Sequence, residues 1–340
     1  MRKQTIHILA IESSCDDTSA AVLSDKRVLS NIISTQDVHE KYGGVVPELA
    51  SRSHQKNIVP VANAAIEQAG LSKNNLDAVA YTVGPGLPGS LIVGSAFAKS
   101  ISMALDVPLI EVNHMEAHIL AHFIEDAHPT APVFPFLCLT VSGGHSQIVL
   151  VKDYNKFEVV GQTLDDAAGE AFDKIAKLIG LSYPGGPLID KHAAKGNAER
   201  FSFSKPKVDS FNYSFSGLKT GVLYFLRDSL KENPAFIKEN FDDICASVQK
   251  TIIEILINKL EKAARHFGIL QIAVAGGVSA NSSLRAALKE RETSLHWKTF
   301  VPPIEYCTDN AAMIGITAYF KYIHKEFSDL NSVPKARLYL

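Results

Sequence analysis

The sequence lacks the features of several common classes of protein. No run of 18 or more apolar residues occurs, which disfavours a transmembrane helix, and residues 1–5 lead into an apolar run without the core of a signal peptide. Low-complexity tracts are also missing from the 340 residues, of which 46% are hydrophobic. We therefore expect a globular, cytoplasmic protein that is long enough to form two domains with their own cores.

Cysteine is scarce and shows no pairing pattern. The four cysteines, Cys15, Cys138, Cys245 and Cys307, are far apart, and none belongs to a Cys-x-x-Cys pair or is paired in sequence with a histidine for nucleophilic chemistry. This distribution predicts buried thiols in a reducing compartment.

Two common phosphate and hydrolase motifs are also missing. No G-x-x-x-x-G-K-[ST] occurs, so the chain is not a P-loop protein, and no Gly-x-Ser-x-Gly occurs. Gly84, Gly86 and Gly89 match the dinucleotide-binding pattern literally, but Pro85 and Pro88 remove N–H donors where a pyrophosphate needs them. The glycines at this predicted helix start suit an anion or a close backbone approach instead.

The chain has little net charge, −2, so no overall field attracts nucleic acid. Residues 191–219 differ, because six basic residues outnumber two acidic ones and five aromatic residues lie among them. The segment holds Lys191, Lys195, Arg200, Lys205, Lys207 and Lys219 with Phe201, Phe203, Phe211, Tyr213 and Phe215. This composition suits single-stranded nucleic acid, but a solvated loop above packed aromatic rings has it too. Both interpretations stay open.

Two histidines follow an apolar run at residues 107–112 that predicts a strand. His114 and His118 are four residues apart at the start of a predicted helix, so they lie one turn apart on one face and can share a metal ion. Glu116 lies about 200° around the helix from either imidazole and points away, unlike the glutamate that directly follows the first histidine in metalloproteases. Spacing alone leaves a metal site and a solvated polar face as alternatives.

Two similar hairpins each lead one half of the chain. Apolar runs within residues 6–23 and 137–151 flank polar turns at 13–18 and 142–146, which suggests a duplicated architecture. Turns rich in Ser, Thr, Asp and Gly direct backbone N–H groups outward, where they can cradle a phosphate or a magnesium-bridged phosphate.

The remaining elements are apolar strands and amphipathic helices. Helices are predicted over residues 47–69, 91–105, 165–179, 244–267, 282–292 and 308–321, and strands over 77–83, 270–275 and 297–301. Asp165 or Asp166 is placed to cap the helix that begins there. Asp309, in the first turn of the last helix, is explained by the helix dipole. It could also be a third, oxygen ligand for the histidine pair, although spacing cannot bring it there.

Several polar residues lie where a ligand could reach them. Asp173 lies inside a predicted helix, so it either faces water or has a function. The predicted turn at 184–187 lets a planar ligand approach the backbone, and Asp190 after it suits ribose hydroxyls. Asn281, after the double glycine 276–277, offers a donor and an acceptor to a nucleotide, although simple capping of the next helix explains it equally well.

These motifs together resemble a known family. The segments are 11–18, 84–89, 113–118, 141–145, 166–173, 184–187, 215–220 and 275–281. In this order they are similar to the tRNA N6-adenosine threonylcarbamoyltransferases, whose bacterial members are the TsaD proteins and which were formerly labelled O-sialoglycoprotein endopeptidases. The match runs from residue 6 to about residue 320.

The resemblance implies an α/β protein with an actin-like, sugar-kinase-like ATPase fold, in which two duplicated ribonuclease-H-type domains enclose a cleft. The domains would be residues 1–132, with a C-terminal helix at about 308–325 packing back on them, and residues 133–307. It implies transfer of the threonylcarbamoyl group from threonylcarbamoyl-AMP to N6 of adenosine 37 in tRNAs that read ANN codons, with release of AMP.

The resemblance also implies the residues of the site. His114, His118 and Asp309 would bind one divalent metal ion per subunit, usually described as iron, with zinc and magnesium as alternatives. The adenylate would be held by Thr140, Val141, Ser142, Gly143, Gly144, Asp173, Gly186, Asp190 and Asn281. No general base for N6 is evident. The implied partners are tRNA, a TsaB-like paralogous subunit and a TsaE-like ATPase, with a separate synthase supplying the adenylate and no membrane involved.

Three other functions are compatible with parts of the sequence. A metallopeptidase would use the histidine pair, but Glu116 is misplaced for it. An actin-like nucleotide switch or scaffold would not need the histidine pair. A small-molecule kinase of the same fold would need a catalytic aspartate, which Asp16 or Asp17 could provide.

Overall fold

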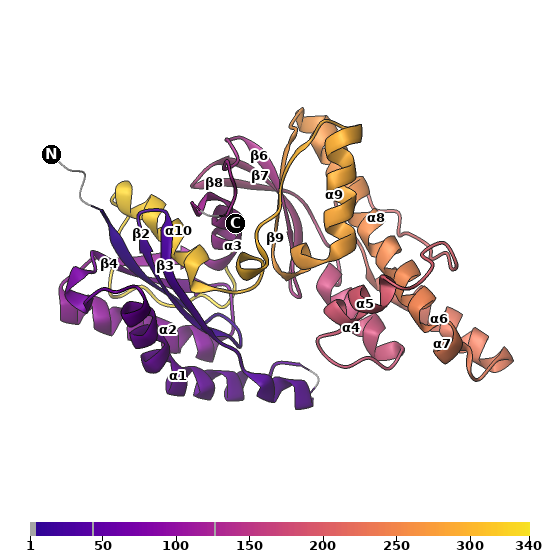
Figure 1. Cartoon of the computed structure of the whole chain (residues 1–340), viewed down its shortest axis with the longest axis horizontal. Helices are drawn as coiled ribbons and strands as arrows, with labels where there is room; N and C mark the ends of the chain where they lie inside the picture. The colour runs from indigo at the N-terminus through magenta and orange to yellow at the C-terminus, as the bar shows by residue number, and fades with distance from the viewer. Residues whose placement is uncertain (1–4, 43, 126) are drawn as a thin grey trace. The chain divides into compact units, whose positions relative to one another are not determined.

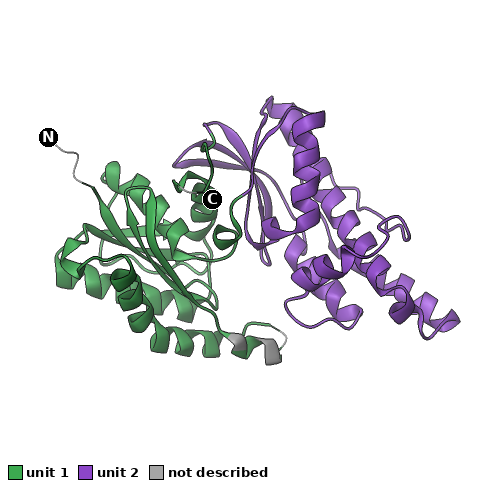
Figure 2. Cartoon of the chain, in the orientation of Figure 1, with its two compact units in different colours: residues 1–132, 302–340 green, residues 133–301 purple. Residues whose placement is uncertain are grey.

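The computed structural model describes residues 5–42, 44–125 and 127–340 (Figure 1). The chain divides into two compact units, one made of residues 1–132 and 302–340 and the other of residues 133–301 (Figure 2). Among the described residues, no helix combines the length and the apolar composition that crossing a bilayer requires. All four cysteines are free thiols, and all but Cys15 are buried.

The first unit is built on a five-stranded sheet with the order β3-β2-β1-β4-β5. Strands β1, β2 and β3 are antiparallel, whereas β1, β4 and β5 are parallel. The strands are β1 (His7–Glu12), β2 (Thr18–Ser24), β3 (Arg27–Ser34), β4 (Ala78–Gly84) and β5 (Leu109–Asn113). The parallel strands are largely buried apolar runs, as expected where helices cover both faces of a sheet.

Helices cover both faces of this sheet (Figure 1). The helices are α1 (Pro47–Gln68), α2 (Pro88–Leu105), α3 (His114–Leu120) and α10 (Ala311–Ile323), with the short 3-10 helices η1 (Asp37–Tyr42), η2 (Lys73–Asn75), η3 (Ala121–Phe123) and η5 (Ile304–Tyr306). Leu9 and Ile11 of β1 pack in the core with α1, and α10 contacts β1, β2 and α3. The last helix of the chain thereby lies beside the helix that follows β5.

The second unit repeats this topology. Its strand order is β10-β9-β6-β7-β8, with β6, β7 and β8 antiparallel and β6, β9 and β10 parallel. The strands are β6 (Phe136–Val141), β7 (Ser146–Asp153), β8 (Lys156–Gln162), β9 (Gln271–Ala275) and β10 (Lys298–Phe300). The helices are α4 (Ala168–Leu178), α5 (Gly185–Ala193), α6 (Ser216–Glu232), α7 (Phe236–Glu239), α8 (Phe241–Phe267) and α9 (Ser282–Ser294), with η4 (Gly277–Ala280). The duplication predicted from the two hairpins is therefore confirmed.

The aromatic residues of segment 191–219 belong to the core of the second unit. Phe203, Tyr213 and Phe215 are buried, and Phe201 and Phe211 pack against the same cluster. Its basic residues are partly neutralised, because Arg200 pairs with Asp243 and Lys205 pairs with Glu254. The stacking interpretation of this segment is wrong, since buried rings cannot stack on bases.

The glycines of segment 84–89 make room for the protein's own chain. A β carbon at Gly84 would overlap the carbonyl oxygen of Lys335, and one at Gly86 would overlap that of Ser14. The backbone N–H of Gly86 donates to the carbonyl of Ala336 (3.2 Å). The glycines therefore serve a close backbone approach, one of the two roles expected of them, and the C-terminal segment occupies the space beside them.

Candidate metal centre and donor site

Helix α3 carries both histidines, and the local sequence explains where it begins. The side chain of Asn113, at the end of β5, accepts a hydrogen bond from the backbone N–H of Met115 (2.8 Å) and caps the helix. The helix therefore starts at His114, reaches His118 one turn later and buries both side chains. The prediction that the two imidazoles share a face is confirmed, because their ring centroids lie 4.7 Å apart.

Asp309 completes a cluster of three potential ligands. Its Oδ1 atom lies 3.1 Å from Nε2 of His118 and 3.4 Å from Nε2 of His114. One potential ligand atom of each residue lies within 4.8 Å of the other two. Packing of α10 against α3 makes this contact across 191 residues of sequence, a distance that spacing rules do not span.

Asp309 does not lie in the first turn of the last helix, so that expectation is wrong. Helix α10 begins at Ala311, and Asn310 caps it by accepting the backbone N–H of Met313 (3.1 Å). Asp309 precedes the cap. Its carboxylate is accounted for by the imidazoles that it faces rather than by the helix dipole.

The charges in this cluster depend on one another. Burial by itself would lower the pKa of His114, but the carboxylates of Asp309 and Glu12 outweigh it and raise this pKa well above its ordinary value of 6.5. Burial would likewise raise the pKa of Asp309, yet His114 and His118 hold it well below its usual range. The metal-free cluster at neutral pH therefore holds ionised carboxylates against a protonated His114.

Glu12 is a member of this centre that the sequence analysis did not propose as a site residue. It ends β1, is completely buried, and places Oε2 3.1 Å from Nδ1 of His114. No spacing rule links two residues 102 positions apart. The parallel pairing of β1, β4 and β5 brings the ends of β1 and β5 together at one edge of the sheet.

The chemistry of the three ligand residues fits a divalent metal ion. Two imidazole nitrogens and one carboxylate oxygen form a set that holds transition metals and leaves positions open for a substrate. Asp309 is only partly buried, whereas both histidines are buried, so the cluster is accessible from the side of the carboxylate. The first unit thus contains a possible metal site.

The turn after β6 is stabilised by the side chain of Ser142, its first residue. Oγ of Ser142 accepts the backbone N–H groups of Gly144 (3.3 Å) and His145 (3.1 Å), so the prediction that these groups point outward to a phosphate is wrong for both. The preceding Thr140 is buried and donates its hydroxyl to the carbonyl of Gln147 (3.4 Å). Gly144 still borders open space, as does Gly143, where a ligand can approach the backbone.

Asp173 caps a second helix rather than facing water. Its Oδ1 accepts the backbone N–H groups of Gly185 (2.8 Å) and Gly186 (3.3 Å), which are the first residues of α5. The stretch 184–187, predicted to be a turn, is therefore the beginning of a helix whose N-cap is Pro184. Burial raises the pKa of Asp173, against the lowering effect of these two N–H groups.

The side chains of Asp190, in α5, and Asn281 both bind the start of α9. The carboxylate of Asp190 accepts the backbone N–H (3.0 Å) and the hydroxyl (2.6 Å) of Ser282. Asn281 caps the helix by accepting the N–H of Leu284 (3.0 Å), and its side-chain amide donates to Gln249 (2.8 Å) in α8. The capping interpretation of Asn281 is thus confirmed, and Gln249 is a neighbour that the sequence did not indicate.

Backbone and side-chain contacts connect the elements that carry the nine residues predicted to hold the adenylate, which lie at the end of β6 and just after it, after β9, and in α4 and α5. The backbone at Gly276 approaches Val141 closely, since a β carbon there would lie 2.5 Å from the carbonyl oxygen of Val141, and its φ of +87° also favours glycine. The carbonyl of Ser142 accepts the N–H of Gly169 (3.2 Å) in the first turn of α4. The carboxylates described above then join α4 to α5 and α5 to α9.

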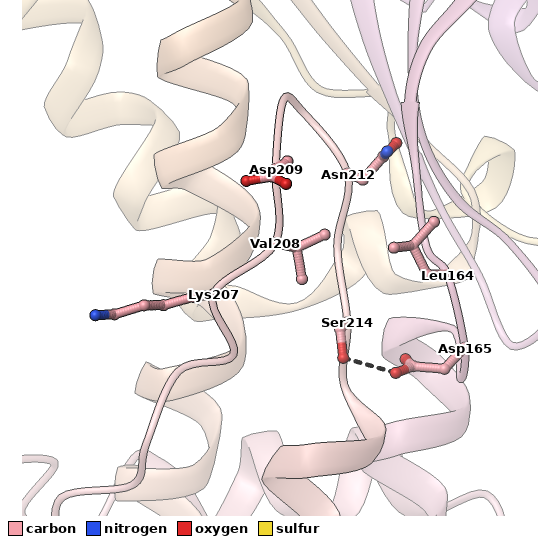
Figure 3. Close-up of a pocket in the computed structure, with 7 residues that line it drawn as sticks. All are labelled: Leu164, Asp165, Lys207, Val208, Asp209, Asn212 and Ser214. Atoms are coloured by element: carbon pink, nitrogen blue, oxygen red, sulfur yellow. Dashed lines mark hydrogen bonds between the residues drawn. The ribbon is translucent and has the colours of Figure 1, made fainter.

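A pocket of about 380 Å³ lies elsewhere in the second unit (Figure 3). Its lining residues are Leu164, Asp165, Lys207, Val208, Asp209, Asn212 and Ser214, none of which belongs to the predicted donor site. Asp165 or Asp166 was expected to cap α4, but the N-cap there is Ala167, and none of the described side chains caps the helix. Asp165 instead accepts the hydroxyl of Ser214 (2.6 Å) and the backbone N–H of Phe215 (2.7 Å) before α6. The side chain of Lys207 extends away from the other labelled residues in Figure 3. The pocket therefore has little positive charge with which to attract an anion.

Comparison with known proteins identifies the family. A sequence profile described as TsaD, tRNA N6-adenosine threonylcarbamoyltransferase, matches residues 27–316. A relative from Christiangramia forsetii with this enzyme name is 61% identical over 99% of this chain and 99% of its own length, and one from Riemerella anatipestifer is 60% identical over 98% of each. The chain belongs to the tRNA N6-adenosine threonylcarbamoyltransferase family. The family predicted from the motifs is confirmed, and the protein is an acyltransferase.

A solved structure shares the fold of this threonylcarbamoyltransferase-family chain. Component A of (R)-2-hydroxyglutaryl-CoA dehydratase from Acidaminococcus fermentans has a TM-score of 0.53 and 16% sequence identity, and the match covers 94% of this chain and 99% of that one. Together with the repeated sheet topology, this confirms the predicted actin-like, sugar-kinase-like ATPase fold.

The geometry of α3 separates this family member from metallopeptidases. Glu116 was predicted to point away from the histidines, and it is absent from the group of potential ligands among the described residues. Burial raises the pKa of Glu116, partly offset by the nearby Lys321 of α10. A glutamate on that side of the helix cannot activate a water molecule held between His114 and His118.

Proposed function

We propose that the protein transfers the threonylcarbamoyl group from threonylcarbamoyl-AMP to N6 of adenosine 37 in tRNAs that read ANN codons. N6 attacks the carbamoyl carbon, the bond from this carbon to the phosphate oxygen breaks, AMP leaves, and N6 loses a proton. Because the donor is a mixed anhydride with a good leaving group, the reaction needs no covalent enzyme nucleophile. Close relatives that carry this enzyme name along nearly the whole chain support the proposal.

The cluster of His114, His118 and Asp309 is the observation that carries the metal-assisted part of this function. We propose Fe(II) as the ion, because two imidazoles and one carboxylate suit Fe(II) or zinc, whereas magnesium prefers oxygen ligands throughout. The ion, when bound, supplies Lewis-acid polarisation of a carbonyl or carboxylate oxygen of the donor. The three side chains hold and orient it.

The second unit provides the groups proposed to hold the adenylate. Gly143 and Gly144 border open space, so a phosphate or ribose can reach their backbone. The carboxylates of Asp173 and Asp190 are each fixed by N–H groups at a helix start, which keeps them in one orientation. Asn281 is fixed in the same way by α8 and α9. Rigid groups of this kind lose little conformational entropy when the adenylate binds.

The partners and boundaries remain part of the proposal. We infer that the two compact units are the two domains, with the segment after residue 301 belonging to the first. The low net charge, −2, is consistent with tRNA being held jointly with other subunits, for which we propose a TsaB-like paralogue and a TsaE-like ATPase. We propose that these components act together in the cytoplasm.

One assay tests the function. The protein is incubated with threonine, bicarbonate, ATP, the synthase, both partners and unmodified tRNA, and the nucleosides are analysed by mass spectrometry. We expect threonylcarbamoyladenosine with the wild-type chain and at least a roughly 100-fold lower rate for the variant that combines His114→Ala with His118→Ala.

His7→Ala is the matched control, because His7 lies at the opposite end of β1 from Glu12 and outside the cluster. If the wild-type chain formed no modified nucleoside with every component present, the proposed reaction would be wrong. Full activity of the double variant would overturn only the metal assignment.

A further inference from the structure

We propose that Glu12 is a positioning residue that selects which nitrogen of His114 binds the metal ion, an inference that rests on the proposed metal centre. The carboxylate lies 3.1 Å from Nδ1 of His114, on the side of the ring opposite to Asp309. The Nε2 atom of the same ring is the one that faces the cluster, 3.4 Å from Asp309.

Two hydrogen bonds hold the carboxylate of Glu12 in a fixed orientation, and Glu12 is the acceptor in both. Its Oε1 accepts the backbone N–H of Ser14 (2.5 Å), and its Oε2 accepts the hydroxyl of Thr82 (2.5 Å) in the neighbouring strand β4. Oε2 also lies 3.1 Å from Nδ1 of His114, whose other neighbour is the hydroxyl of Ser14 at 3.2 Å. A hydroxyl can accept as well as donate, whereas the carboxylate can only accept. Glu12 therefore acts as an acceptor toward the imidazole, and Nδ1 must carry the proton.

A proton on Nδ1 decides the chemistry of the other nitrogen. The neutral imidazole has one N–H and one lone pair, so fixing the proton on Nδ1 directs the lone pair of Nε2 toward Asp309 and the ion. A carboxylate behind a histidine ligand also raises its basicity and fixes the plane of its ring. Glu12 thereby fixes the orientation of one of the two histidines before any metal arrives, and Nε2 is the nitrogen that gives up its proton when the ion binds.

The second histidine has no equivalent support. Nδ1 of His118 is buried without a hydrogen-bond partner among the described residues, while its Nε2 faces Asp309. The two ligands, one helical turn apart, thus differ in what lies behind them. We infer that His114 is the ligand whose orientation is built into the fold, and that Glu12 provides this orientation.

A merely structural role for Glu12 predicts different behaviour. A glutamate that only fills and satisfies the end of β1 would change the stability of the fold when replaced, but it would leave the metal affinity of the folded protein unchanged. Glu12→Gln separates the two roles. If the amide oxygen keeps the bond from Ser14, the NH₂ group faces His114 and favours a bare Nδ1, with the proton moved to Nε2.

The first measurement is the affinity of the purified full-length chain for Zn(II), determined by competition with a chromogenic chelator. We expect Glu12→Gln to bind Zn(II) about 10- to 100-fold more weakly than the wild-type chain. Glu261→Gln is the matched control, since Glu261 is a largely buried carboxylate that pairs with Arg291 and Arg265 in the second unit. We expect this control to lose stability without losing Zn(II) affinity. An affinity of Glu12→Gln within about twofold of wild type would overturn the inference.

The second measurement needs no variant and decides the question if Glu12→Gln does not fold. In the wild-type chain loaded with ¹¹³Cd(II) and labelled with ¹⁵N-histidine, NMR spectra should show coupling of the metal to Nε2 of His114 and a proton on Nδ1. Coupling to Nδ1 would overturn the inference while leaving the metal centre intact. A wild-type chain that bound neither Zn(II) nor Cd(II) would overturn the metal centre itself.

Discussion

The aspartates of the two units differ in the groups that their carboxylates contact. In the first unit, Asp309 points at two imidazoles and makes a side-chain cluster of mixed charge. In the second unit, Asp173 and Asp190 point at the backbone N–H groups that begin α5 and α9. Asn281 does the same at α9. The first arrangement collects ligand atoms around one place, and the second fixes the starts of α5 and α9.

The cluster in the first unit can bind a cation, whereas the network in the second unit stabilises the fold. A replacement in the first cluster removes one of the three potential ligand atoms found among the described residues. A replacement in the second network leaves backbone N–H groups at a helix start without an acceptor, which costs free energy of folding whether or not substrate is present. Replacements in the cluster of the first unit should therefore lower metal affinity. Replacements in the network of the second unit should lower the free energy of unfolding.

The largest expected effect is on metal affinity in the first unit. Asp309→Asn replaces the carboxylate of the three-residue cluster by a neutral amide, and we expect Zn(II) affinity to fall by more than about 100-fold. The measurement is chelator competition. Asp173→Asn is the matched control, because it makes the same chemical change in the second unit and should leave Zn(II) affinity unchanged. Equal losses of Zn(II) affinity in both variants would contradict the proposed difference between the two units.

The next effect is the pH dependence of metal binding. Because the pKa of His114 is raised well above 6.5 in the metal-free protein, the ion has to displace a proton there, whereas Asp309 is already ionised. We expect Zn(II) affinity to rise by up to about tenfold per pH unit between about pH 6.5 and 8. Calorimetry in buffers of different ionisation enthalpy should show proton release across this range. Affinity that is flat above pH 6.5 would count against the raised pKa.

A smaller effect is expected on stability in the second unit. Asn281→Ala removes both the cap of α9 and the bond to Gln249, and we expect the free energy of unfolding to fall by about 1–2 kcal/mol. Urea denaturation measures this change. Ser294→Ala, at the exposed end of the same helix, should change stability by less than about 0.5 kcal/mol. Neither variant should alter Zn(II) affinity. A change in Zn(II) affinity would contradict the proposed difference between the two units.

The smallest effect concerns Asp17, in the turn between β1 and β2. Burial, Asp16 and Asp309 raise its pKa to about 7, and its Oδ1 is buried without a partner among the described residues. Since the folded state prefers the protonated acid, the contribution of Asp17 to stability is present below the unfolded pKa of about 3.9 and is lost as pH rises through about 7.

Asp17→Asn should therefore stabilise the metal-free protein at pH 8 by about 0.5–1 kcal/mol and by less at pH 5, as measured by urea denaturation. The Zn(II)-loaded protein should show a smaller difference, because the cation offsets the charge of Asp309. An equal effect at both pH values would mean that ionisation of Asp17 is not its cause.

Much of the fold could be predicted from local patterns. The two hairpins predicted a duplicated architecture, and both units have the same order and direction of strands. Apolar runs and amphipathic segments located the predicted helices and strands to within a few residues, because these patterns follow from the geometry of each element. Strands β3 and β8 and helices α5, α6 and α7 were not predicted. Predicted and observed boundaries differ at helix starts such as Ala311, where a polar cap sets the boundary.

The sequence by itself determined the shared face of His114 and His118, because four residues make about one helical turn. Spacing could not determine the third ligand, which only the family resemblance implied, or the residue behind His114, or the helix that each carboxylate caps. A local rule assigned Asp165 or Asp166 to the nearest helix, whereas in the structure Asp165 binds the start of α6, 50 residues away. Glu12 and Asp309 reach the histidines only because strand pairing and packing of α10 join segments that no periodicity connects. Contacts between distant segments were decided by the tertiary structure, since they depend on how whole elements pack and not on spacing within one of them.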